Sequence, residues 1–212
     1  MTLRQMLQKT LLVFAVCTAT AAHADTVING CTIIKHPIEA VPTWCPGSDL
    51  SNADLSNRDL SGADLSGANL SNANLVNTRI EGGTLANANL AGANLSDAYL
   101  RGVNLTGVDL STATLTGLVA FSITACPSAL PPQWQCTSGV LAGPGMQAIN
   151  YYTPYMNGIV LDNAHLEGSN LRSASLKNAS LKGAQLQGAD LSMAEMQYAN
   201  LDNANLSGAD LR

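Results

Sequence analysis

The chain has 212 residues, of which 46% are hydrophobic, 12% charged and 4% aromatic. Ordinary globular chains carry about 25% charged residues, but the abundance of Leu and the low charge exclude a disordered chain. Asp and Glu (15) outnumber Lys and Arg (10), which disfavours a basic nucleic-acid binder. A composition skewed in this way indicates an internal repeat.

Residues 1–24 have the features of a secretory signal peptide. Arg4 and Lys9 supply a basic region, residues 11–22 form an apolar run too short to span a bilayer, and residues 22–24 have the A-x-A form of a cleavage site. A buried N-terminal helix is the alternative. Cleavage would leave 8 basic and 15 acidic residues, a net charge of −7. We expect a periplasmic or secreted protein without a membrane span in the mature chain.

Four cysteines remain in the mature chain: Cys31, Cys45, Cys126 and Cys136. An even number of cysteines in an exported chain favours disulfides, and of the three connectivities we prefer the local pairs Cys31–Cys45 and Cys126–Cys136. Zinc is the alternative, but neither spacing has the close C-x2-C pairs of structural zinc sites. We therefore expect no metal and no cofactor. Residues 25–47, which also contain Trp44, are predicted to cap the element that follows.

An apolar residue recurs at every fifth position in two blocks, residues 48–115 and 159–212. Ala often precedes it by two positions, with Asp, Asn or another polar residue between them. A helix would scatter these apolar residues around its surface, and a flat strand would send them to alternate faces. The period fits a chain that turns a corner once per pentad, with the apolar and small residues inside. Such units stack into a solenoid.

The run Ala63-Asp64-Leu65-Ser66-Gly67 resembles the A(D/N)LXX repeat of the pentapeptide repeat family. The resemblance covers about two thirds of the mature chain. It implies an all-β fold, a right-handed quadrilateral β-helix with four pentads per coil and about six coils in two blocks. The interior of such a coil is narrow, which accounts for the scarcity of aromatic residues.

Residues 116–158 interrupt the repeat, because Leu115 and Leu161 are 46 residues apart, one more than nine pentads. Proline cannot join an interior ladder, so part of this Cys/Pro/aromatic insert must leave the coils. One interpretation is a disulfide-stapled loop that covers the solenoid. The other is a partner-binding loop, whose candidate residues are Trp134, Tyr151, Tyr152 and Tyr155.

The sequence contains no recognisable nucleophile, metal-binding or phosphate-binding motif, and we predict that the protein is not an enzyme. His165 takes the outward position of its pentad and is interpreted as a solvated substitute for Asn. A carbohydrate-active β-helix enzyme is a third hypothesis, and it would require neighbouring carboxylates.

The family resemblance also raises the hypothesis of a DNA mimic that modulates gyrase or another topoisomerase. With 20 residues per coil, however, the acids form a ring around the first coil instead of a ladder along the rod: Asp49, Asp54, Asp59 and Asp64. An exported protein would also not meet gyrase. We expect a non-catalytic exported scaffold that binds a protein or a surface polymer and no nucleic acid. A homodimer through the C-terminal coil is a further expectation.

Overall fold

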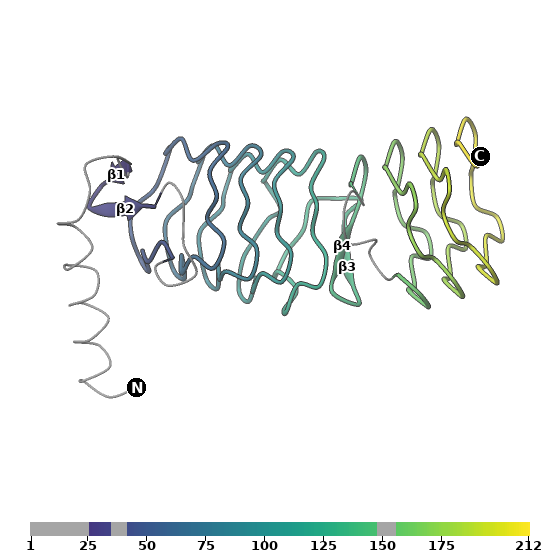
Figure 1. Ribbon diagram of the computed structural model, residues 1–212, viewed down its shortest axis with the longest axis horizontal. Helices are drawn as coiled ribbons and strands as arrows, with labels where there is room; N and C mark the ends of the chain where they lie inside the picture. Colours follow the sequence, from purple (N-terminus) through teal and green to yellow (C-terminus); the bar gives the residue numbers. More distant parts are fainter. Residues whose placement is uncertain (1–25, 35–41, 148–155) are drawn as a thin grey trace.

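The computed structural model describes residues 26–34, 42–147 and 156–212. Its coils stack along one axis, with a small hairpin at one end and the C-terminus at the other (Figure 1). The predicted signal peptide, residues 1–24, lies outside the described residues. Within the ranges that are described, no helix is long and apolar enough to cross a membrane.

Each coil contains 20 residues. Parallel bridges join outward residues that are 20 positions apart, and four successive pairs complete one turn: Asp49–Asn69, Asp54–Asn74, Asp59–Arg79 and Asp64–Thr84. Four pentads therefore make one coil with four sides, as the family resemblance implies. We name each side by its first outward residue: the Trp44, Asp49, Asp54 and Asp59 sides.

The backbone of each pentad is held by bonds to both neighbouring coils and by a tight corner. On the Asp49 side, the Leu50 N–H donates to the Asn69 carbonyl at 2.7 Å, and the Asn69 N–H donates to the Ser48 carbonyl at 2.9 Å. At the corner, Ala53 N–H bonds to the Leu50 carbonyl at 3.1 Å. The intervening Asn52 has a φ of 56°, a conformation that Asn and Gly tolerate. This requirement explains the frequent Asn and Gly at the second corner position.

Leu and Ala fill the interior as predicted. Leu65, Leu70 and Ala63 are 0% exposed. Thr78 is buried at an interior position that Ala usually takes, and its Oγ1 donates to the Leu55 carbonyl at 2.8 Å. The buried hydroxyl is therefore satisfied, and the narrow core stays closed.

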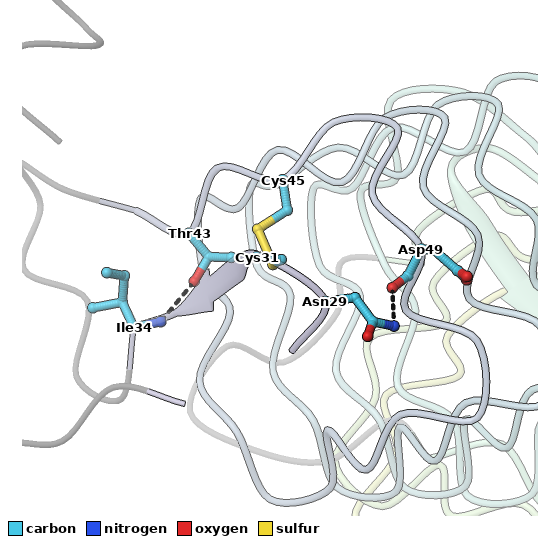
Figure 2. The surroundings of a disulfide bond; sticks show 6 residues. All are labelled: Asn29, Cys31, Ile34, Thr43, Cys45 and Asp49. Atoms are coloured by element: carbon cyan, nitrogen blue, oxygen red, sulfur yellow. Dashed lines mark hydrogen bonds between the residues drawn. A yellow bond between two sulfur atoms is a disulfide. The ribbon is translucent and has the colours of Figure 1, made fainter. Parts of the chain in front are cut away.

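The first coil is capped by an antiparallel hairpin of β1 (Thr26–Ile28) and β2 (Cys31–Ile33). The predicted Cys31–Cys45 disulfide is present and ties β2 to the first pentad. Figure 2 shows two further ties: Asn29 Nδ2 donates to the Asp49 carbonyl at 2.9 Å, and the Ile34 N–H donates to Thr43 Oγ1 at 3.1 Å. These contacts hold the hairpin on the first coil. Trp44, which the sequence predicts to be part of the cap, already bridges Asp64 of the next coil.

The coil continues into the predicted insert before the chain leaves it. Tyr99 bridges Val119 at the usual spacing, Asn104 bridges Ala125 one residue later than usual, and Asp109 bridges Ala129 at the usual spacing again. The one-residue shift at Ala125 is cancelled by Ala129. The residue that makes the Leu115–Leu161 interval one longer than nine pentads therefore lies after Ala129.

A second antiparallel hairpin follows, made of β3 (Gln135–Thr137) and β4 (Val140–Ala142). The predicted Cys126–Cys136 disulfide ties β3 to the preceding coil. The Leu141 N–H donates to the Ala120 carbonyl at 3.1 Å. The hairpin lies between the two runs of coils (Figure 1).

Strand β4 separates two hydrophobic cores. Leu141 belongs to the core of the first block, whereas Val140 and Ala142 belong to the core of the second. Beyond the hairpin, Gln147 bridges Asn170 and returns the chain to the rod. All three residues of β4 are buried, as expected for a strand covered on both faces.

Candidate functional site

The outward Asp and Asn side chains form ladders along the rod. Asn69 Nδ2 donates to Asp49 Oδ1 at 3.0 Å, and Asn89 Nδ2 donates to Asn69 Oδ1 at 3.1 Å. Asn74 makes the same bond to Asp54 on the next side, at 3.0 Å. An ionised Asp can only accept hydrogen bonds, whereas Asn both donates and accepts. Asp can therefore begin a ladder, and Asn can continue it.

The same carboxylates also hold the corners. Asp49 and Asp54 accept a bond from the N–H of the serine two residues later, Ser51 and Ser56, each at 3.1 Å. Hydrogen bonds from these serines hold the pKa of both carboxyls below its usual value. Asp59 and Asp64 accept the equivalent bonds from Ser61 and Ser66. The acidic ring is therefore hydrogen-bonded to the scaffold, and it passes from the first coil into the second, because Asp64 stacks on Trp44.

The ladder chemistry predicts that Asn69→Asp destabilises the solenoid in a pH-dependent way. The new carboxylate keeps the acceptor for Asn89 but meets the Asp49 carboxylate in place of a donated hydrogen bond. Repulsion between them raises the pKa of one carboxyl in the folded state, so the loss of stability is full at neutral pH. It shrinks as protonation begins below about pH 4 to 5.

Urea midpoints of Asn69→Asp and the wild type at pH 7 and pH 3 measure this effect. The matched control is the swapped double variant Asp49→Asn/Asn69→Asp, which restores a donor opposite a carboxylate and should recover the midpoint at pH 7. A midpoint of Asn69→Asp that stays at the wild-type value at pH 7 contradicts the ladder.

One pair of stacked carboxylates meets the requirement for neighbouring acids that the hypothesis of a carbohydrate-active enzyme makes. Asp190 bridges Asp210 one coil later on the Asp59 side. Arg212 donates from Nη2 to Asp210 Oδ2 at 2.7 Å and lowers the pKa of Asp210 to about 2. Ser192 lowers the pKa of Asp190. A general acid needs a raised pKa, so this pair is poorly suited to donate a proton.

His165 takes the outward position predicted for it and bridges Gln185 of the next coil. Its Nδ1 lies 2.9 Å from Glu167 Oε1, and both side chains are about one third exposed. The imidazole therefore belongs to a surface pair with an acid on the same corner, which is compatible with the expected solvated role.

The predicted binding residues of the insert are placed only in part. Trp134 is half-buried and packs against both cores, and a methyl group on Gly143 would lie 2.2 Å from Cδ2 of its ring. Tyr151, Tyr152 and Tyr155 lie outside the described residues. The part of Trp134 that packs between the cores has a structural role, and binding by this loop stays a prediction.

Two exposed aromatic residues lie outside the set of predicted binding residues. Trp44 is 57% exposed at the outward position of the first pentad, and Tyr198 is 89% exposed at a corner of the last coil with a φ of 61°. Nearly all other positive-φ residues are Gly, Asn, Asp or Ser. The sequence contains a signal for both residues, because each is an aromatic residue at a pentad position that is mostly polar or Gly in the other pentads.

Comparison with known proteins identifies the repeat. The family profile described as pentapeptide repeats matches eight copies, over residues 48–85, 84–117, 155–192 and 175–212. A search of curated proteins gives no match.

Solved structures of similar proteins include two pentapeptide repeat proteins and one fluoroquinolone resistance protein. HetL from Nostoc sp. strain PCC 7120, involved in heterocyst differentiation regulation, is 23% identical over 79% of this chain and 84% of its own, with a TM-score of 0.38. A protein of the Arabidopsis thaliana thylakoid lumen is 24% identical over 69% and 66%, with a TM-score of 0.28. QnrB1, a plasmid-mediated fluoroquinolone resistance protein, is 17% identical over 80% of each chain, with a TM-score of 0.32.

Proposed function

The chain belongs to the pentapeptide repeat family, and from this premise we propose that it is a non-catalytic, exported scaffold that binds a protein or a surface polymer. The observation that carries the proposal is the state of its outward polar groups. The carboxylate and amide groups of Asp49, Asn69 and Asn89 are hydrogen-bonded to one another and to backbone N–H groups at the corners. Groups bound in this way build a stiff, regular surface, and such a surface suits recognition better than proton transfer.

Export is the second part of the proposal. It is supported by the basic and apolar pattern of residues 1–24 and by two disulfides, which persist in oxidising compartments. Expression of the full chain in a bacterial host, followed by fractionation and intact-mass analysis, tests it. We expect mature protein that begins at Asp25 outside the cytoplasm. Uncleaved protein retained in the cytoplasm would contradict export.

Binding through the insert is tested by affinity capture from the extracytoplasmic fraction of the source cells. The test variant is Tyr151→Ala/Tyr152→Ala, and it leaves Trp134 intact because that residue packs between the cores. Tyr198→Ala is the matched control, since it removes an exposed tyrosine from the second block. We expect the double variant to lose a partner that the control retains. Equal recovery by both would assign binding to another surface.

The geometry weakens the DNA-mimic alternative. Duplex DNA presents negative charge at regular intervals along its axis, whereas here the acids of the ring meet no acid in the next coil, where their partners are Asn69, Asn74, Arg79 and Thr84. Purified protein is therefore expected to leave gyrase supercoiling unchanged. Inhibition that depends on the Asp ring would support the mimic instead of the scaffold.

Self-association through the C-terminal coil completes the proposal. Leu201 and Leu206 are half-buried and Leu211 is exposed, whereas the equivalent Leu181 and Leu186 of the preceding coil are fully buried. Covering these apolar side chains with a second copy would remove them from water. We expect light scattering of the protein at micromolar concentration to give twice the chain mass, and Leu206→Lys to give the monomer mass. A monomer for the unmutated protein would exclude this dimer.

A further inference from the structure

The two disulfides differ in their access to solvent. Cys31, which lies in β2 of the N-terminal hairpin, and its partner Cys45 are each 3% exposed. Cys126 is exposed and Cys136 is half-buried. Thiol–disulfide exchange requires an attacking thiolate to reach one sulfur of the bridge. In the folded protein, the Cys126–Cys136 bridge is therefore the one that a soluble reductant reaches more easily.

The accessible bridge also holds the element that separates the two cores. Cys136 lies in β3, which pairs with β4, and β4 places Leu141 in one core and Val140 and Ala142 in the other. Trp134, two residues before Cys136, packs against both cores. Movement of this hairpin would therefore disturb the junction between the blocks and leave the distant coils intact.

The N-terminal hairpin is tied more extensively. Besides its disulfide, it is held by the side chain of Asn29 on the Asp49 carbonyl and by the Thr43 hydroxyl, which accepts from Ile34 (Figure 2). A reductant must open this hairpin before it reaches the buried Cys31 and Cys45. The two hairpins are alike in construction, but the bridge of the second is more exposed.

We propose that the Cys126–Cys136 disulfide is a redox-sensitive latch on the β3–β4 hairpin, and that the Cys31–Cys45 disulfide is a permanent staple. A dithiol reductant opens the latch: its thiolate attacks one sulfur of the bridge, forms a mixed disulfide and releases the other cysteine as a thiolate. The second thiol of the reductant then closes its own disulfide and releases the remaining cysteine. The protein gains two electrons and two protons, and the dithiol is oxidised by the same amount.

The first test measures which bridge opens. Folded, oxidised protein is incubated with dithiothreitol without denaturant, the free thiols are trapped with N-ethylmaleimide, and peptides are quantified by mass spectrometry. We expect Cys126 and Cys136 to be labelled about tenfold faster than Cys31 and Cys45, because access limits exchange. Equal rates, or faster labelling of Cys31 and Cys45, would overturn the proposal.

The second test measures what the latch controls, by hydrogen exchange in matched variants. Cys126→Ser/Cys136→Ser should increase amide exchange at Leu141 and Gln147, with residues 50–75 unchanged. Cys31→Ser/Cys45→Ser should show the reverse distribution. If the first variant exchanges like the wild type throughout, the bridge is not a latch. If every amide of that variant exchanges faster together, the bridge stabilises the whole rod and the proposal is also overturned.

Discussion

Leu70→Asp is expected to unfold the first block of the solenoid. Leu70 is 0% exposed, and its neighbours along the interior of the same side are Leu50 and Leu90 of the adjacent coils, which are also buried. An aspartate there removes the packing of a leucine and buries a charge without a partner. Together these effects cost roughly 4 kcal/mol or more, a large share of the stability of a domain of this size.

Thermal unfolding followed by circular dichroism measures this effect. Asn57→Asp is the matched control, because it adds the same charge at an exposed corner and keeps the oxygen that accepts from Asn77 Nδ2. Asp also tolerates the φ of 57° at that corner. The control should melt close to the wild type. An unchanged melting temperature for Leu70→Asp would show that Leu70 is not an interior residue.

The success of the coil prediction follows from the strictness of the repeat. A five-residue unit must turn at the same point each time, so every Leu and Ala has a single environment, and reading Ala63 and Leu65 as interior residues required no long-range information. Both residues are 0% exposed, which confirms that they are interior residues. The local disulfide pairing was also accessible, because the cysteines of the two pairs are only 14 and 10 positions apart.

The turn of each hairpin has a dipeptide that could have predicted the hairpin from the sequence. Asn29-Gly30 and Ser138-Gly139 both lie at the turn of a two-residue hairpin, and all four residues have positive φ. Such dipeptides between short β-prone segments are hairpin markers. The prolines around the second hairpin are typical of a loop, so the local pattern there indicates a loop and not the strands within it.

The ladders and the core boundary could not be read from the sequence. The bond from Asn69 to Asp49 depends on the distance between coils and on side-chain orientation, neither of which the period specifies. The contact between Trp134 and Gly143 likewise joins residues nine positions apart across a hairpin that follows no repeat. Aromatic content alone made Trp134 a candidate binding residue, whereas its packing depends on the path of the hairpin.

Gly143→Ala should destabilise the junction between the two cores. The added methyl group would lie 2.2 Å from Cδ2 and 2.4 Å from Cε2 of the Trp134 ring. The ring packs against both cores, and the Cys126–Cys136 bridge restrains β3, which begins one residue after Trp134. Overpacking of this kind costs roughly 1–3 kcal/mol. A fall in the urea midpoint, followed by circular dichroism, measures it.

A double-mutant cycle separates the clash from a backbone effect. Trp134→Ala alone leaves a cavity that costs roughly 3–5 kcal/mol, but it removes the atoms that the new methyl group meets. Adding Gly143→Ala to that background should therefore cost little, so the coupling between the two positions is large. Gly168→Ala is the control: its methyl group meets nothing within 4 Å, but its φ of 64° costs about 1–2 kcal/mol in any background. An equal cost of Gly143→Ala with and without Trp134 would show that the ring does not occupy this place in the core.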